Sequence, residues 1–190
     1  IPTDLPLVVQ VSRFDPWKDP QGVIEAFKLA RKEVPCRLVL LGNVATDDPE
    51  GPKVYESLLQ EQSDEILIMS QQDGALVNAL QRKATVVVQK SIREGFGLTV
   101  SEAMWKGAPV IGGNVGGIRL QIDDGVNGFL VSSVPEASDR MVRLLRNPAV
   151  SREMGEKARV KVRQHFLLTR YLEQYLDLFN SFETVYRLKT

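Results

Sequence analysis

The segment 91–104 combines two carboxylates with a glycine loop that leads into a predicted helix. Glu94 and Glu102 lie eight residues apart, and Gly95 and Gly97 come just after the first of them. A loop of this kind, between a strand and a helix, presents free backbone N–H groups and the positive end of a helix dipole to an anion. Glycine also lets a ligand approach the backbone closely. The segment therefore predicts an anion site with two carboxylates beside it.

A second polar loop follows the first predicted strand and carries Arg13 and Lys18. The planar guanidinium of Arg13 and the compact charge of Lys18 suit a diphosphate. Phosphate repels carboxylates, so Glu94 and Glu102 are expected to bind hydroxyl groups, such as those of a ribose or a transferred sugar. The two loops together therefore predict a nucleotide-sugar site. The alternative is that all four are surface residues, with Arg13 paired to Asp15.

A third candidate is the glycine-rich segment 112–117, which follows the fifth predicted strand. Its backbone either approaches the same ligand or forms a plain turn. The residues alone leave both interpretations open.

Short apolar segments alternate with helical patterns along the chain. Most of the apolar segments are nearly continuous, which indicates strands covered by helices on both faces. The predicted strands are 7–11, 37–41, 66–69, 85–89, 109–111 and 129–131. Helices are predicted from Pro20 onward, with Asp19 as the N-cap, and at 55–60, 75–82 and 98–106.

The C-terminal part of the chain, 133–190, has a mostly helical pattern. Ser133 and Glu136 form a capping-box arrangement, Pro148 is expected to close that helix, and Ser151 to cap the next one. We therefore expect the whole chain to form one α/β domain. Its core would be a doubly wound, Rossmann-like parallel sheet of about six strands, followed by a helical C-terminal tail.

The composition is that of an ordinary globular protein, with 43% hydrophobic and 25% charged residues in a chain of 190. The 24 basic and 24 acidic residues balance, so no net field favours nucleic acid or an anionic membrane. No apolar segment has the length of a membrane span or the form of an export signal. The single cysteine, Cys36, is expected to be a small packing residue in a reducing compartment, and cytoplasm is the predicted location.

Five separated motifs resemble those of family 4 retaining glycosyltransferases. In chain order they are Arg13-x4-Lys18, Glu94-x7-Glu102, Gly107-Ala-Pro109-Val, Val115-Gly116-Gly117 and Asp124-Gly125-x-x-Gly128-Phe-Leu-Val131. The whole chain resembles the C-terminal, nucleotide-sugar-binding half of that two-domain GT-B fold. The segments 12–18, 47–51 and 92–107 are most similar to trehalose glycosyltransferring synthases, and less so to trehalose phosphorylases.

The resemblance implies a role for each site residue. Arg13 and Lys18 would bind the diphosphate and stabilise the leaving group, and Glu102 would hold the ribose hydroxyls. Glu94, the third implied catalytic residue, would hold the glucose and the distal phosphate. It would act with the backbone of the loop that follows it, formed by Gly95, Phe96, Gly97 and Leu98. The implied reaction moves glucose from ADP- or UDP-glucose to glucose, forms trehalose with retention of configuration, and needs no metal or cofactor.

The chain departs from the family pattern at two places. Family members often have glycine where this chain has Asp19, whose charge would weaken diphosphate binding unless it turns away as a helix cap. Many also continue Gly-Gly-x-Pro-Glu, whereas here Gly117 is followed by Ile118-Arg119-Leu120, as in the trehalose enzymes.

The acceptor-binding half of the family fold is expected to be missing. The chain opens six residues before its first predicted strand, and its only histidine, His165, lies in the helical region. We therefore expect a donor-binding domain that does not turn over alone. Its last helix would expose an apolar patch that the missing half covers, or that pairs in a homodimer.

Three other interpretations stay open. The run Gly95-Phe-Gly97-Leu-Thr-Val100 imitates the start of a nicotinamide-dinucleotide fingerprint, but the third glycine and the following acidic residue are missing. A non-catalytic module, excised or engineered, that binds nucleotide or a protein partner is the second. A sugar-nucleotide epimerase, which shares the architecture, is the third.

Overall fold

Six parallel strands form one sheet in the order β3-β2-β1-β4-β5-β6. The structure is a computed structural model that describes residues 1–2, 4–43 and 51–187, with 183–187 described by their backbone alone. The α/β class, the doubly wound parallel sheet and all six predicted strand positions are confirmed. The strands are β1 (Leu7–Val11), β2 (Arg37–Gly42), β3 (Ile66–Ser70), β4 (Val86–Gln89), β5 (Val110–Gly113) and β6 (Gly128–Val131).

The strand order reverses between β1 and β4. From β1 the chain builds outward through β2 to β3, and then returns to place β4 on the other side of β1. The two strands are direct neighbours, with Val8 opposite Val86 and Val9 opposite Val87. A crevice opens beyond the carboxyl ends of strands at such a switch point, because the connections on its two sides leave in opposite directions. The loops after β1 and β4 therefore border one crevice.

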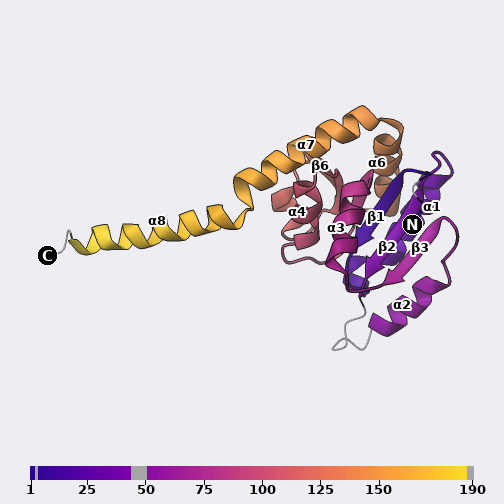
Figure 1. Cartoon of the computed structure of the whole chain (residues 1–190), viewed down its shortest axis with the longest axis horizontal. Helices are drawn as coiled ribbons and strands as arrows, with labels where there is room; N and C mark the ends of the chain where they lie inside the picture. The colour runs from indigo at the N-terminus through magenta and orange to yellow at the C-terminus, as the bar shows by residue number, and fades with distance from the viewer. Residues whose placement is uncertain (3, 44–50, 188–190) are drawn as a thin grey trace.

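Helices cover both faces of the sheet (Figure 1). On one face, α1 and α6 bury alternate strand residues such as Val8 and Leu38. On the other face, α3, α4 and α7 cover Leu7 and Val9. The helices are η1 (Pro16–Lys18), α1 (Pro20–Arg31), α2 (Gly51–Leu59), α3 (Gly74–Lys83), α4 (Leu98–Trp105), α5 (Ile118–Gln121), α6 (Val134–Arg146), α7 (Pro148–His165) and α8 (Leu168–Arg187). The segment 47–51 resembles that of trehalose glycosyltransferring synthases, and its residues 47–50 lie outside the described residues.

The predicted caps of the C-terminal helices need two corrections. Ser133 caps α6, because its Oγ accepts a hydrogen bond from the Glu136 N–H at 3.3 Å. The Glu136 carboxylate accepts from the N–H of the residue before Ser133 at 2.7 Å, one position earlier than in a capping box. The prediction that Ser151 caps α7 is wrong, because α7 already begins at Pro148, whose ring favours the first helical position. The Ser151 hydroxyl donates to the carbonyl of Thr85 at 3.1 Å instead.

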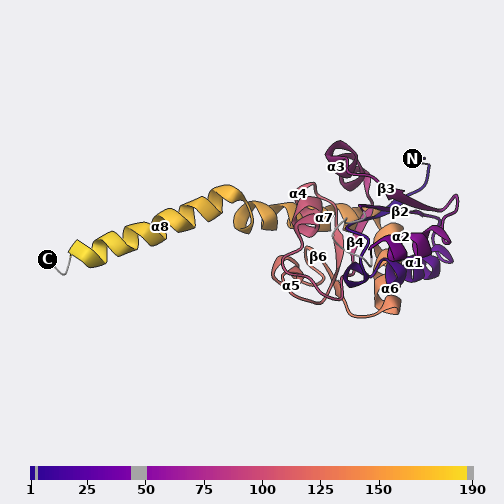
Figure 2. The same cartoon turned by 90° about the horizontal axis from the view of Figure 1, so that it is seen from below.

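The last helix, α8, extends away from the body of the domain in both views (Figure 1 and Figure 2). Its apolar side chains are exposed, as the sequence predicts. They include Leu168, Tyr171, Leu172, Tyr175, Leu176, Phe179 and Phe182. Coverage of this face by a further domain or by a second copy stays a prediction.

Cys36 is a buried core residue with a free thiol, which confirms its predicted packing role. Burial raises the pKa of this thiol to about 11, because the thiolate would lose its hydration in the core. Within the described ranges, no helix is both long enough and apolar enough to cross a membrane.

The glycine-rich segment 112–117 packs against the loop that carries Glu94. A Cβ atom at Gly116 would lie 1.7 Å from the Glu94 carbonyl oxygen. The N–H of Gly117 donates to the carbonyl of Gly95 at 2.8 Å. The glycines therefore allow two loops of this chain to pack backbone against backbone, which is more than a plain turn and requires no ligand.

Gly116→Ala is expected to lower the free energy of unfolding by more than about 2 kcal/mol, measured by urea denaturation. The added Cβ overlaps a backbone oxygen, and the φ of +46° is left-handed. Gly125→Ala is the matched control, because its φ is +75° but no atom lies within 4 Å of the built Cβ. It should lose only about 1 kcal/mol. Equal losses in the two variants would mean that the close packing contributes nothing.

Candidate functional site

Two adjoining cavities lie at the carboxyl ends of β1 and β4. The first, of about 380 Å³, is here named the central cavity, and it is lined by Ser12, Arg13, Lys18, Gln89, Glu94, Phe96, Gly97, Leu98 and Thr99. The second, of about 310 Å³, is named the side cavity, and its lining includes Ser12, Arg13, Asn43, Gln71, Asp73 and Thr99. Most of the predicted site residues thus meet around one space. Gly95 and Glu102 line neither cavity.

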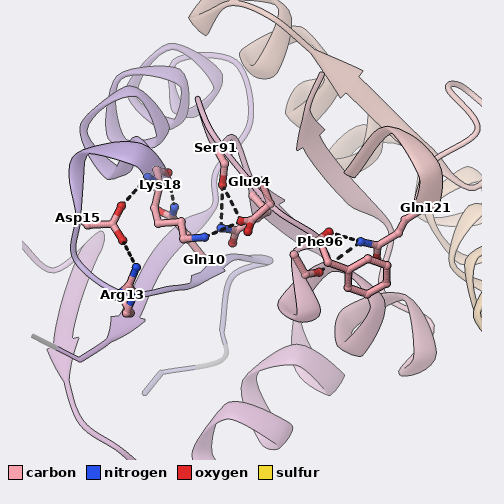
Figure 3. A network of polar contacts seen from close by, with 10 residues as sticks. Gln10, Arg13, Asp15, Lys18, Ser91, Glu94, Phe96 and Gln121 are labelled. Atoms are coloured by element: carbon pink, nitrogen blue, oxygen red, sulfur yellow. Dashed lines mark hydrogen bonds and ion pairs between the residues drawn. The ribbon is translucent and has the colours of Figure 1, made fainter. Parts of the chain in front are cut away.

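Lys18 and Glu94 form the main contact of the central cavity (Figure 3). Lys18 Nζ lies 2.5 Å from Glu94 Oε2, and the side chains are only 17% and 10% exposed. Gln10 of β1 donates to the backbone carbonyl of Lys18 at 2.9 Å. Ser91 Oγ lies 3.3 Å from the same Oε2 atom of Glu94. Because a partly buried ion pair is screened less than a surface one, this contact holds the two loops together.

Arg13 pairs with Asp15, as the alternative interpretation of the sequence predicted. The Arg13 guanidinium lies 3.3 Å from Asp15 Oδ2, without hydrogen-bond geometry, and the side chains are 54% and 3% exposed. Asp15 also caps η1, because its Oδ1 accepts from the N–H of Lys18 at 3.1 Å. Asp15 therefore contacts the guanidinium of Arg13 and the backbone N–H of Lys18, while Arg13 stays largely exposed and lines both cavities.

Asp19 turns away from the central cavity and acts as a helix cap. Its Oδ1 accepts from the N–H of Gly22 at 3.1 Å, and its Oδ2 pairs with Lys90 Nζ. Among the described residues, Asp19 is the single non-glycine with a positive φ, of 48°. Such a backbone suits glycine, the residue that the family pattern often has here. The Asp19 charge is thus offset by Lys90, and Asp19 does not line the central cavity.

The first turn of α4 presents backbone N–H groups to the central cavity. Gly97 is the N-cap, with a φ of 85°, and no side chain of the described residues caps this helix. Leu98 and Thr99, the first two helical residues, line the cavity. Gln121 fixes the turn by donating from Nε2 to the carbonyl of Phe96 (Figure 3). The start of α4 therefore offers backbone hydrogen-bond donors for an anion, and these donors are already in place.

Glu102 lies one turn further along α4 and is exposed to solvent. Residues three apart share a helix face, so Glu102 lies on the side of α4 that carries Thr99. Burial lowers the pKa of nearby Lys106, and the Glu102 carboxylate partly opposes this shift. The ribose role of Glu102 stays a prediction.

Comparison with known proteins places the chain in a family. The family described as Glycosyl transferases group 1 matches residues 1–161. The chain belongs to the group 1 glycosyl transferases. A trehalose synthase of Pyrococcus horikoshii is 48% identical over 182 residues, which are 93% of this chain and 44% of that protein.

Two further known proteins are similar to this glycosyl transferase. A trehalose phosphorylase of Grifola frondosa is 34% identical over 174 residues, which are 82% of this chain and 24% of that protein. The solved structure of a sucrose-phosphate synthase from Thermosynechococcus elongatus matches with a TM-score of 0.81 and 30% identity, over 97% of this chain and 47% of that one. The resemblance to trehalose-forming glycosyltransferases of GT-B fold is confirmed. The chain spans less than half the length of these relatives.

Three residues of this glycosyl transferase site, Gln89, Ser91 and Thr99, are not predicted from the sequence. Gln89 ends β4 and lines the central cavity, Ser91 contacts Glu94, and Thr99 lies between the two cavities. The sequence does contain an indication for Gln89, because a glutamine within an otherwise apolar strand is rarely buried unless its amide has a structural or functional role. For Ser91 and Thr99 the sequence carries no comparable signal.

The central cavity of this glycosyl transferase brings together two cations, the N–H groups of a helix start and one carboxylate. Such a set can bind an anion next to a group that carries hydroxyls. Among the described residues, no group of three or more His, Cys, Asp or Glu side chains is arranged to hold a metal ion.

Asp19→Ala is expected to lower the free energy of unfolding by about 1–2 kcal/mol, because it removes an N-cap at a left-handed residue. Asp19→Asn should lose less, since asparagine keeps the cap acceptor and tolerates this backbone. Chemical denaturation of both variants measures the difference. Equal losses would mean that the ion pair with Lys90, and not the cap, is the contribution of Asp19.

Proposed function

We propose that the central cavity binds the diphosphate and the sugar of a nucleotide-sugar, and that this domain is the donor-binding part of a retaining glycosyltransferase. One observation carries the proposal. Arg13, Lys18, Glu94 and the start of α4 line the same cavity at the switch point of the sheet. Two cations and helix N–H groups offset a diphosphate, and a carboxylate accepts hydrogen bonds from sugar hydroxyls.

Binding in this site is an exchange of partners. Without ligand, Asp15 and Glu94 offset the charges of Arg13 and Lys18. A diphosphate brings more negative charge than either carboxylate, so it competes for both cations. Glu94 is then released to accept hydrogen bonds from the sugar, together with the backbone from Gly95 to Leu98. During transfer the same cations stabilise the charge that develops on the leaving diphosphate.

The side cavity is the proposed site of the nucleoside. It shares Ser12, Arg13 and Thr99 with the central cavity, so one ligand can occupy both. Asn43, Gln71 and Asp73 offer donors and acceptors for a base. Glu102, on the side of α4 that carries Thr99, is proposed to accept hydrogen bonds from the ribose hydroxyls. This second space favours a nucleotide-dependent synthase. Trehalose phosphorylase, supported by the relative from Grifola frondosa, is the second candidate.

The proposed reaction moves glucose from ADP- or UDP-glucose to glucose and forms trehalose with retention of anomeric configuration. The similarity to the trehalose synthase of Pyrococcus horikoshii supports it. We assign the acceptor site to a separate part of the enzyme, because this chain corresponds to 44% of that relative. The domain alone then binds nucleotide without turnover. The exposed face of α8 is the surface proposed to meet the acceptor part, and the cytoplasm is the proposed location.

Arg13→Ala and Lys18→Ala are each expected to weaken ADP or UDP binding by about 1.5–3 kcal/mol, the loss of a charge-assisted hydrogen bond. Isothermal titration calorimetry measures the affinity. Arg152→Ala is the control, because it removes an exposed arginine on α7 away from both cavities. Unchanged affinity in both site variants would refute the diphosphate assignment.

A further inference from the structure

Glu94 has a second anchor besides Lys18. Its Oε2 atom lies 2.5 Å from Lys18 Nζ and 3.3 Å from Ser91 Oγ. Ser91 Oγ in turn lies 3.1 Å from Gln89 Nε2, at the end of β4. Ser91 and Gln89 are buried, with 3% and 1% of their surface exposed. A chain of contacts therefore runs from the sheet through Gln89 and Ser91 to the carboxylate, and is here named the Gln89–Ser91 relay.

The direction of the hydrogen bonds in this relay follows from the protons available. A carboxylate only accepts, and a serine hydroxyl has a single proton, so Ser91 donates that proton to Glu94. Gln89 must then supply an N–H to Ser91 Oγ, which fixes the orientation of its amide. The Gln89 carbonyl oxygen is left buried without a partner among the described residues. An orphaned acceptor of this kind destabilises a fold, so it is expected where the other end of the group serves a function.

Ligand binding changes which anchor holds Glu94. In the proposed function, Lys18 leaves the carboxylate and turns to the diphosphate. Glu94 then loses its 2.5 Å contact with the ammonium group, and Ser91 remains as its hydrogen-bond partner. Both anchors meet at Oε2, which leaves Oε1 to the ligand. The position of that oxygen therefore depends on the relay once a diphosphate is bound.

We propose that Ser91 and Gln89 are positioning residues, which hold Glu94 in place for the sugar of the donor after Lys18 has turned to the diphosphate. This inference rests on the proposed function. A nucleoside diphosphate has no transferable sugar, so the hydrogen bonds that Glu94 is proposed to accept from sugar hydroxyls are absent from its complex. The relay should therefore affect only the contribution of the sugar to binding.

The test measures, for each variant of the full chain, the dissociation constants of a nucleoside diphosphate and of its glucose conjugate (UDP and UDP-glucose, or ADP and ADP-glucose). The constant of the nucleoside diphosphate divided by that of the conjugate isolates the contribution of the sugar to binding. Ser91→Ala is expected to lower this ratio by about fivefold or more, while the nucleoside diphosphate affinity changes by less than about twofold. Ser91→Thr keeps the hydroxyl and should retain the ratio. Ser138→Ala, which removes another buried serine hydroxyl on α6, should change neither constant.

A double-mutant cycle shows whether the relay acts through Glu94. In a Glu94→Ala background, Ser91→Ala should cause no further loss. Gln89→Met keeps the size of the side chain but removes its amide, so it should lower the ratio in the same direction. Added to Ser91→Ala, it should lower the ratio no further, because both changes break one chain of contacts.

The outcomes separate the relay from the proposed function. An unchanged ratio in Ser91→Ala, or a loss that persists in the Glu94→Ala background, overturns the relay while the nucleotide site stands. Failure of the unmodified protein to bind either nucleoside diphosphate overturns the proposed function, and the relay with it.

Discussion

The ion pair between Lys18 and Glu94 joins two loops that lie 76 residues apart in the sequence. It forms because β1 and β4 are neighbours at the point where the strand order reverses, so that the loops after them share a crevice. The other contacts of the site support one end or the other. Gln10 and Asp15 fix the backbone of Lys18, and Ser91 holds the carboxylate. Because both loops line the central cavity, one ligand can contact the cations and the carboxylate together.

The site is balanced in charge before any ligand arrives. Each of the two cations faces a carboxylate, so neither is left partly buried and unpaired, which would destabilise the fold. In the proposed function, the affinity for a diphosphate is the difference between new and old partners, and the helix N–H groups of α4 are proposed to make that difference favourable. Backbone packing by Gly116 and Gly117 fixes the Glu94 loop, so the proposed exchange requires only side chains to move.

The sequence predicts the sheet well, because continuous apolar segments and glycine loops are local signals. It also predicts which loops carry the cations and Glu94, since both follow strands whose carboxyl ends meet at one edge. What it misses are contacts between segments that lie far apart in the chain. Ser151 resembles a helix cap but donates to Thr85, and the glycines at 116 and 117 pack on a neighbouring loop. The role of Gln89 depends on Ser91 and Glu94 together, which no single-residue pattern reveals.

The most direct test is a crystal structure of the chain with a bound nucleoside diphosphate. We predict a diphosphate between Arg13, Lys18 and the first N–H groups of α4, with the base in the side cavity. Lys18 Nζ should have moved from Glu94 to a phosphate oxygen. A diphosphate bound at another edge of the sheet, or a Lys18 that still contacts Glu94 and leaves the phosphate alone, would contradict this arrangement.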